Sequence, residues 1–162
     1  MYKLKIKFAE LSDAKLIHDL MIKAFMGYKE EIPPSSALEE SVASISAALK
    51  NNEKGLVAYI DEMPVGMVRF QLTENGLYFY RLSVIPEEQG KGIAKKILKA
   101  LEKYARDKDL PALYCKVRLT IKKNINLYRS VGYTIYNEEV VTKPNGIEVK
   151  VVLMKKDLYK VN

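Results

Sequence analysis

The apolar positions of the chain follow two different spacings, and these predict its strands and helices. The first eight residues, MYKLKIKF, alternate lysine with apolar side chains, which is the period of a β-strand. A helical period follows, with Ser12 as the expected N-cap. Its apolar positions are Leu16, Ile17, Leu20, Met21 and Ala24. A second helix is expected to begin at Ser36, because Glu39 stands three residues later in a capping-box pattern.

The middle of the chain has the composition of β-strands. Residues 55–60, 64–72 and 77–84 are rich in valine, tyrosine, phenylalanine and isoleucine. The sequence DEMP separates the first two segments, and TENG separates the second from the third. Within TENG, Asn75-Gly76 is the strongest short signal for a β-hairpin. These three segments are therefore predicted to form an antiparallel meander.

The last part of the chain alternates helices with strands. Apolar residues keep a helical spacing from Ala94 to Ala105. The elements expected after this helix are a strand at 112–117, a helix that ends at Gly132, a strand at 133–141 and, after the Asn145-Gly146 turn, a strand at 147–156. The order β-α-α-β-β-β-α-β-α-β-β joins antiparallel strands to a parallel crossover. It predicts a mixed sheet of seven strands with four helices, in the class α+β (α/β by looser usage).

Composition narrows the class of protein. Hydrophobic residues make up 48% of the 162 residues and charged residues 29%, which is typical of one globular domain, here residues 1–162. The sequence has neither a signal peptide nor an apolar run long enough to span a bilayer, so no membrane partner is expected. One cysteine, Cys115, allows no internal disulfide and favours the cytoplasm. One histidine, His18, makes a metal site unexpected.

The formal charge of +7 favours acidic partners without naming one. The sequence EEQGKGIAKK, residues 87–96, places two glycines and several lysines between a strand and a helix. A P-loop requires the pattern G-x-x-x-x-G-K-[ST], which is absent from the sequence. A dinucleotide-binding fingerprint requires three glycines, and only Gly90 and Gly92 are present here. Both nucleotide-binding interpretations therefore fail. What remains is Gln-x-x-Gly-x-Ala, in which glycines let backbone amides at a helix start approach a phosphate. A plain strand-to-helix connection is the alternative.

Two motifs together resemble the GNAT superfamily of acetyl-CoA-dependent N-acyltransferases. The first is RLSVIPEEQGKGIAKKILKALEKYA, and the second is NLYRSVGY, in which Leu127, Tyr128, Gly132 and Tyr133 match the family pattern. The motifs cover residues 81–133, and the predicted order of elements extends the match along the chain. The resemblance implies a twisted mixed sheet that splays between its fourth and fifth strands, where acetyl-CoA enters.

The same resemblance implies roles for particular residues. The backbone of Leu82, Ser83 and Val84 is expected to pair with the pantetheine arm of acetyl-CoA, and the Val84 amide to stabilise the developing oxyanion. Tyr128 is expected to protonate the departing thiolate, because a phenol is a suitable acid for it, and packing on the sheet beside Leu127 is the alternative. The residues expected to hold the pyrophosphate are Gln89, Gly90, Lys91, Gly92, Ile93, Ala94 and Lys95. Dimers are common in this family, so a homodimer is one state that it implies.

Some positions depart from the family pattern. Ile121 stands where an asparagine is frequent, and Asn124 is expected to contact the cofactor or to start the helix. The strand at 77–84 has no acid to serve as the general base. Tyr28, Glu30 and Glu31, between the first two helices, are the remaining candidates for the base, and a solvated acidic turn is the favoured alternative. The pair Pro33-Pro34 is expected to stiffen the loop over the acceptor site or to mark a helix boundary.

Three functions compete at this stage. The first is transfer of an acetyl group from acetyl-CoA to an amine of a small molecule or a protein. The second is a GNAT fold that binds acyl-CoA without turnover. The third is a nucleic-acid-binding module, which only the positive charge supports. The sequence has no aromatic-basic interleaving and no helix-turn-helix pattern, so no nucleic-acid partner is expected. Cys115 and His18 are interpreted as structural residues, since the chemistry needs no acyl-enzyme.

Overall fold

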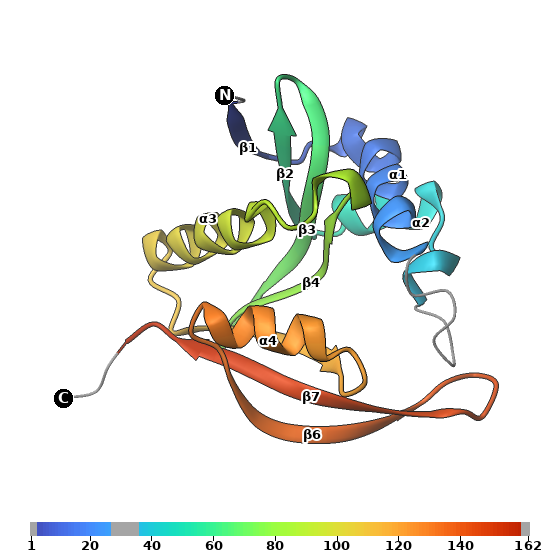
Figure 1. The fold of residues 1–162 in the computed structure, drawn as a ribbon, viewed down its shortest axis with the longest axis vertical. Coiled ribbons are helices and arrows are strands. Elements are labelled where there is room, and N and C mark those ends of the chain that lie inside the picture. The colour runs from blue at the N-terminus through green and yellow to red at the C-terminus, as the bar shows by residue number, and fades with distance from the viewer. Residues whose placement is uncertain (1–2, 27–35, 160–162) are drawn as a thin grey trace. The chain divides into compact units, whose positions relative to one another are not determined.

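A computed structural model describes residues 3–26 and 36–159 of the chain (Figure 1). The strands are β1 (Leu4–Phe8), β2 (Lys54–Ile60), β3 (Met63–Thr73), β4 (Gly76–Val84), β5 (Ala112–Arg118), β6 (Thr134–Thr142) and β7 (Glu148–Asp157). The α-helices are α1 (Ala14–Phe25), α2 (Val42–Lys50), α3 (Ile93–Asp107) and α4 (Lys122–Ser130). The order of elements predicted from the sequence is confirmed.

The strands form one seven-stranded sheet in the order β1-β2-β3-β4-β5-β7-β6. Strands β1, β2 and β3 pair antiparallel in succession, β4 pairs parallel with β5, and β7 pairs antiparallel with both β5 and β6. The parallel pair joins Leu77 to Leu113 and Tyr78 to Tyr114. The mixed sheet and the class α+β are therefore confirmed.

The chain divides into two compact units. The first contains Met1–Gln71 with Tyr80–Leu101, and the second contains Leu72–Phe79 with Glu102–Asn162. Strands β3 and β4 and helix α3 each contribute residues to both units. The single domain expected from the sequence stays a prediction.

Helical periodicity places the core of the first unit. The face of α1 that carries its apolar positions is buried, with Ile17 and Met21 at 1% and 0% exposure. Helix α1 packs against α2, whose buried residue is Ile45. The interior also contains strand residues from β2 and β3, among which Val57, Met67 and Phe70 are almost fully buried. The apolar periods read from the sequence thus mark the buried faces.

The second unit is built on the antiparallel strands β5, β7 and β6. Strand β6 is an edge strand of the sheet, and its residues are exposed or half-buried. Helix α4 buries Ile125 and Tyr128. The ring of Phe79 contacts Tyr128 edge-on, with 5.7 Å between the ring centroids, and contacts Tyr133 at 5.8 Å. These three rings form an aromatic cluster that fixes the inner face of α4 within this unit.

The predicted start of the first helix is wrong. Ser12 lies inside a 3-10 turn, Leu11–Asp13, and α1 begins at Ala14. The Glu10 amide donates a hydrogen bond to Asp13 Oδ2 at 2.8 Å, so an acidic pair closes the turn in place of a serine cap. A carboxylate can accept a hydrogen bond from an unpaired amide just as a serine hydroxyl can. The sequence pattern therefore did not distinguish Asp13 from Ser12 as the acceptor.

The predicted start of the second helix is also wrong. Ser36 and Glu39 bound a separate 3-10 turn, and α2 begins at Val42 with Ser41 as its N-cap. Ser41 Oγ accepts the Ser44 amide at 3.0 Å, and Ser44 Oγ accepts the Ser41 amide at 3.1 Å. The reciprocal bonds of a capping box thus form five residues later than expected, between two serines.

None of the helices in the described ranges is long and apolar enough to cross a membrane. Within the same ranges no group of three or more His, Cys, Asp or Glu side chains is arranged to hold a metal ion.

Candidate functional site

A glycine turn separates strand β4 from helix α3 in the first unit. A short 3-10 turn, Pro86–Glu88, follows the strand, and α3 begins at Ile93. Gly90 and Gly92 between them each have a φ of +82°, a left-handed conformation that side chains disfavour. A Cβ atom added at either position would meet nothing within 4 Å. The backbone of this turn is therefore open to a ligand, and only glycine adopts it without strain.

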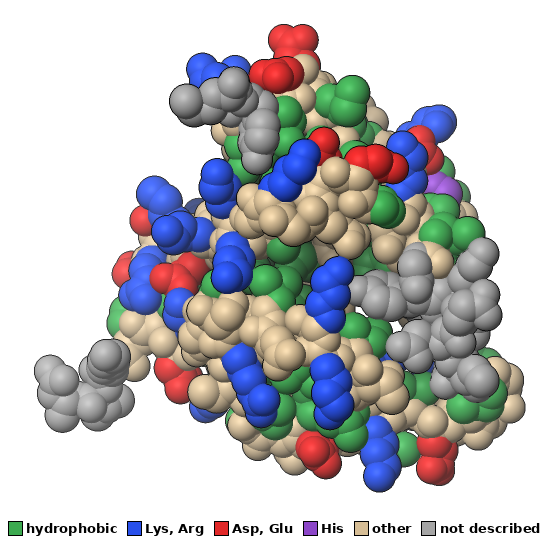
Figure 2. Space-filling model, in the orientation of Figure 1, with side chains coloured by type: hydrophobic (Ala, Val, Ile, Leu, Met, Phe, Trp, Pro, Cys, Tyr) green, Lys and Arg blue, Asp and Glu red, His purple; other side chains and the backbone are tan. Residues whose placement is uncertain are grey.

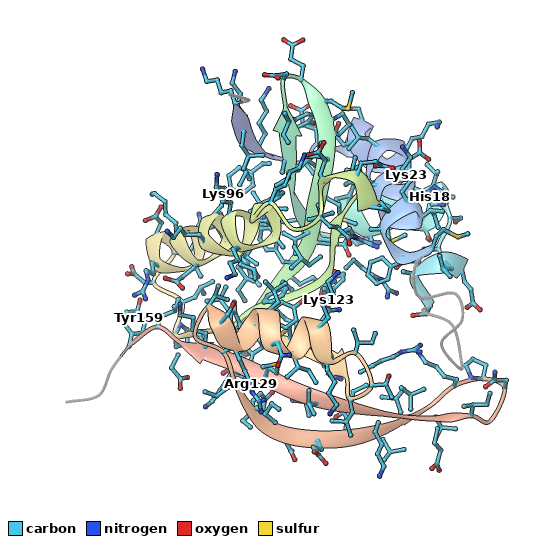
Figure 3. All side chains as sticks on the ribbon, viewed as in Figure 1. His18, Lys23, Lys96, Lys123, Arg129 and Tyr159 are labelled. Atoms are coloured by element: carbon cyan, nitrogen blue, oxygen red, sulfur yellow. The ribbon has the colours of Figure 1, made fainter. Side chains whose placement is uncertain are left out.

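The start of α3 has the electrostatics of an anion site. The first-turn amides of a helix have no intrahelical acceptor, and the helix dipole makes that end positive. Lys95, Lys96 and Lys99 are exposed on α3, and none of them has an ion-pair partner in the described part of the chain. Figure 2 shows basic side chains gathered over this helix, and Figure 3 labels Lys96 among them. An open turn, free amides and nearby lysines fit the pyrophosphate of acetyl-CoA.

The end of β4 is tied to this turn by side chains. Gln89 Nε2 donates a hydrogen bond to the carbonyl oxygen of Val84 at 3.0 Å. The Ile85 amide donates to the Val65 carbonyl at 2.9 Å, so the strand end is also fixed to β3. Ser83 and Val84 are buried, and Leu82 is half-buried. Gln89, predicted as a cofactor residue, thus holds the strand that carries the expected oxyanion amide.

The strand kinks one residue before Leu82. Arg81 has a φ of +59° inside β4, a left-handed conformation that costs a non-glycine residue about 1–2 kcal/mol. Its carbonyl oxygen accepts a hydrogen bond from Ser83 Oγ at 2.8 Å. The strain persists only if surrounding contacts hold it, and it sets the direction in which the following peptides point.

Gly66 allows β3 and α3 to pack closely on this strand. A Cβ atom at position 66 would lie 2.9 Å from the Ser83 carbonyl oxygen and 3.1 Å from Ile97 Cδ1. Any side chain here would push the Ser83 peptide out of place. Gly66 therefore supports the site without belonging to it, and nothing in the sequence alone singled it out.

Tyr128 and Asn124 belong to the second unit. They are four residues apart on α4 and lie on the same side of that helix. Tyr128 is 7% exposed, and its ring centroid is 5.9 Å from that of Tyr133. The Tyr133 amide donates to the Tyr128 carbonyl at 3.0 Å across Gly132, whose φ is +101°. This turn explains the Leu-Tyr-x-x-x-Gly-Tyr pattern, because only glycine reverses the chain here without strain.

Cys115 and His18, which are interpreted from the sequence as structural residues, have environments that fit a structural role. Cys115 is buried, and burial raises the pKa of its thiol, so the thiolate that a nucleophile requires is disfavoured. His18 Nε2 lies 3.0 Å from the carbonyl oxygen of Glu40, within hydrogen-bond distance. Both side chains are thus explained by packing and hydrogen bonding.

The sequence interpretation missed a network of buried and half-buried charged and polar side chains in the first unit. Its members are Glu40, Glu53, Arg69, Tyr80 and Arg81. An arginine inside the apolar run of β3 was a signal that could have found it, because a buried arginine requires carboxylate partners. The acidic candidates Glu30 and Glu31, with Tyr28 and the pair Pro33-Pro34, lie outside the described residues.

The comparisons with known proteins agree with this fold. The chain belongs to the Acetyltransferase (GNAT) family, which it matches over residues 15–133. No curated protein sequence matches it. The family resemblance read from the two motifs is therefore confirmed.

Several solved structures share the fold at low sequence identity. The ribosomal-protein-S18-alanine N-acetyltransferase from Escherichia coli superposes with a TM-score of 0.80 at 15% identity, covering 99% of this chain and 97% of that one. The putative acetyltransferase yncA from Salmonella typhimurium, solved with acetyl-CoA, gives 0.75 at 17%, covering 98% and 95%. The PaiA N-acetyltransferase from Thermoplasma acidophilum, solved with coenzyme A, gives 0.75 at 16%, covering 96% and 99%.

Proposed function

We propose that this protein is an N-acetyltransferase that transfers the acetyl group of acetyl-CoA directly to a primary amine. The observation that carries the proposal is the open glycine turn at the start of α3, with a φ of +82° at Gly90 and Gly92, in a member of the GNAT family. Two structures with the same fold, yncA and PaiA, were solved with acetyl-CoA and coenzyme A. The acceptor is a small molecule or a protein amine.

The proposed cofactor residues come from three segments. The backbone of Leu82, Ser83 and Val84 pairs with the pantetheine arm, and Asn124 contacts the cofactor from α4. The amides of residues 90–95 and the lysines of that segment hold the pyrophosphate. The kink at Arg81 and the bond from Gln89 to Val84 support these assignments, because they fix the strand backbone that the pantetheine would meet.

Acetyl-CoA supplies an acetyl group activated as a thioester. The acceptor amine forms a C–N bond to the acetyl carbon, and the C–S bond breaks. The Val84 amide donates a hydrogen bond to the thioester oxygen and stabilises the negative charge that develops there. Tyr128 gives its phenolic proton to the departing thiolate and regains one from solvent. The amine loses its proton to water. Because the amine attacks the thioester directly, no acyl-enzyme forms and Cys115 takes no part.

Glu40 is unsuited to act as the general base. Burial raises the pKa of this carboxyl, but the hydrogen bonds and charges of Arg69 and Arg81 outweigh that effect and lower it below the usual value. Both of its oxygens accept bonds from these arginines, at 2.7 Å each. A weakly basic carboxylate with both oxygens engaged is a poor proton acceptor, which favours deprotonation of the amine through water.

The test is a panel of amines assayed for thiol release from acetyl-CoA. We expect release that requires both the protein and one class of amine, and we propose a neutral or anionic amine because the protein is basic. Acetyl-CoA binding without release for any amine would favour a non-catalytic acyl-CoA-binding protein. Salt-dependent binding to duplex DNA with no acetyl-CoA binding would favour the nucleic-acid module. A cytoplasmic location and a homodimer remain part of the proposal.

A further inference from the structure

A network of ion pairs centred on the buried residues Arg69 and Glu53 lies in the first unit, beside the strand assigned to acetyl-CoA. The Arg69 side chain is 4% exposed, and it donates Nε to Glu53 Oε2 at 2.8 Å and Nη1 to Glu40 Oε2 at 2.7 Å. The Tyr80 hydroxyl donates to the second oxygen of Glu53. The Arg69 guanidinium also lies over the Tyr80 ring, 5.6 Å from its centroid. Glu53 is therefore fully engaged by Arg69 and Tyr80.

Glu40 extends this network to Arg81. Arg81 Nε donates to Glu40 Oε1 at 2.7 Å, and its Nη2 donates to Ser36 Oγ at 3.1 Å. The carboxylate of Glu40 thus bridges two arginines, one from β3 and one from β4. The two cations lower the pKa of the Glu40 carboxyl despite the opposing effect of burial, and this lowered pKa favours its charged form. Charge-assisted bonds at this distance hold the Arg81 side chain in one place.

The residue held in this way is the one with the left-handed backbone. Arg81 has a φ of +59° and immediately precedes Leu82, the first residue assigned to the pantetheine. An arginine does not adopt this conformation without support, and the structure supplies support at its side chain through Glu40 and at its carbonyl through Ser83. Loss of the side-chain support would let residue 81 relax toward an extended conformation and would reorient the peptides that follow.

We propose that Glu40 is a positioning residue for cofactor binding: by holding the Arg81 side chain, it keeps β4 kinked and orients the backbone of Leu82–Val84 toward acetyl-CoA. This inference rests on the proposed function, since it assumes that these peptides bind the pantetheine. Glu40 and Ser36 lie between α1 and α2, so the same contacts join that connection to the cofactor strand.

Substitutions at Arg81 separate the side-chain tether from the backbone conformation. Arg81→Ala removes the tether and leaves a residue that disfavours positive φ, whereas Arg81→Gly removes the tether but adopts positive φ freely. We expect the Kd for acetyl-CoA, measured by calorimetric titration, to rise about fivefold in Arg81→Ala and in Glu40→Gln, the equivalent of about 1 kcal/mol. Arg81→Gly should bind about fivefold more tightly than Arg81→Ala. In the Arg81→Gly background, Glu40→Gln should have no further effect.

Glu102→Gln is the matched control. Glu102 also bridges two cations, Lys156 and Arg106, and its pKa is also lowered, but it lies in the second unit. We expect this variant to lose stability in urea unfolding without a change in the Kd for acetyl-CoA.

Three results would overturn the inference. One is a wild-type Kd in Glu40→Gln. Another is equal binding by Arg81→Gly and Arg81→Ala, and the third is an equal effect of Glu40→Gln in both backgrounds. A wild-type protein that fails to bind acetyl-CoA would instead contradict the proposed function, so the two failures are distinguishable.

Discussion

Gln89 donates its side-chain amide to the carbonyl oxygen of Val84, with 3.0 Å between Nε2 and O. The bond crosses the corner between β4 and the glycine turn, and it joins the two backbone segments proposed to bind acetyl-CoA. In this arrangement the glutamine of the Gln-x-x-Gly-x-Ala motif acts on the protein itself. A motif position that appears to serve the ligand can therefore serve the geometry of the ligand site.

Gln89→Ala removes this bond and leaves a buried carbonyl with one partner fewer. We expect the Kd for acetyl-CoA to rise by about threefold to tenfold, because a net hydrogen bond contributes about 0.5–1.5 kcal/mol. Calorimetric titration measures it directly. Gln89→Glu presents a carboxylate to the Val84 carbonyl, and we expect it to bind more weakly still. If both variants bound like the wild type, the bond would have no role in placing the strand.

The glycine turn is tested by Gly92→Val. A branched side chain at a φ of +82° is strained, and it would occupy the open space above the backbone where the pyrophosphate is proposed to lie. We expect the affinity for acetyl-CoA to fall by about a hundredfold or more while the protein still folds, because the side chain both strains the turn and blocks the space of the pyrophosphate.

Gly146→Val is the control for this substitution. Gly146 has a φ of +85° and equally open surroundings, but it lies in the turn between β6 and β7. We expect the same order of destabilisation as in Gly92→Val, with an unchanged Kd for acetyl-CoA. Equal binding losses in both variants would show that strain alone, and not the site, explains the effect.

The proposed acid is tested by Tyr128→Phe. The substitution removes one hydroxyl and keeps the ring that packs on Phe79. We expect kcat to fall about 10²-fold, the lower end of the usual range for general acid catalysis, with little change in the Kd for acetyl-CoA. Steady-state kinetics with thiol detection, together with titration, separates the two quantities. A wild-type kcat would mean that solvent protonates the thiolate.

Tyr133→Phe is the matched control for the acid. Tyr133 is 3% exposed in the same aromatic cluster, and its hydroxyl has no hydrogen-bond partner in the described part of the chain. Removing a buried unsatisfied hydroxyl should leave kcat unchanged and should leave the free energy of unfolding equal or slightly higher. A loss of kcat as large as that of Tyr128→Phe would assign the effect to packing.

Acid should destabilise the fold through two bridging carboxylates. Burial raises the pKa of both Glu40 and Glu102, but their cationic partners lower it below the usual 4.5. A carboxyl whose pKa is lower in the folded state stabilises the protein above its unfolded pKa, and that contribution is lost as the pH falls through the folded value. We therefore expect the free energy of unfolding to fall below about pH 4.5. Urea unfolding at several pH values measures it.

Glu40→Gln and Glu102→Gln check the assignment of this acid effect. Each variant should be less stable than the wild type near neutral pH, and the difference should shrink as the pH falls below the pKa of the carboxyl. A difference that stayed constant with pH would show that the charge of the carboxylate does not contribute.

The glycine turn and the order of elements could be predicted because local chemistry determines them. Gly90 and Gly92 stand where the chain needs positive φ, and the apolar periods of the strands and helices mark their buried faces. The starts of α1 and α2 could not be placed, because several hydroxyls and acids near each start satisfied the same capping rule. The sequence predicts caps at Ser12 and Ser36, whereas Ser41 caps α2 and Asp13 accepts the Glu10 amide at the turn before α1.

The charged network could not be predicted from spacing. Glu40 and Arg81 are separated by 41 residues, and Glu40 and Arg69 by 29, so no periodic pattern connects them. Their pairing depends on how α2 and the strands fold together. The left-handed conformation of Arg81 was equally hidden, because an arginine inside a strand normally indicates extended backbone.

The most direct test of the central claim follows a labelled acetyl group. The protein is incubated with acetyl-CoA that carries an isotope in the acetyl group and with the amine selected from the panel, and the amine and the intact protein are analysed by mass spectrometry. We predict that the label moves to the amine in amounts equal to the thiol released, that no labelled protein accumulates, and that Cys115→Ala transfers as well as the wild type. Label that stays on acetyl-CoA with every amine, while the protein binds it, would contradict the account.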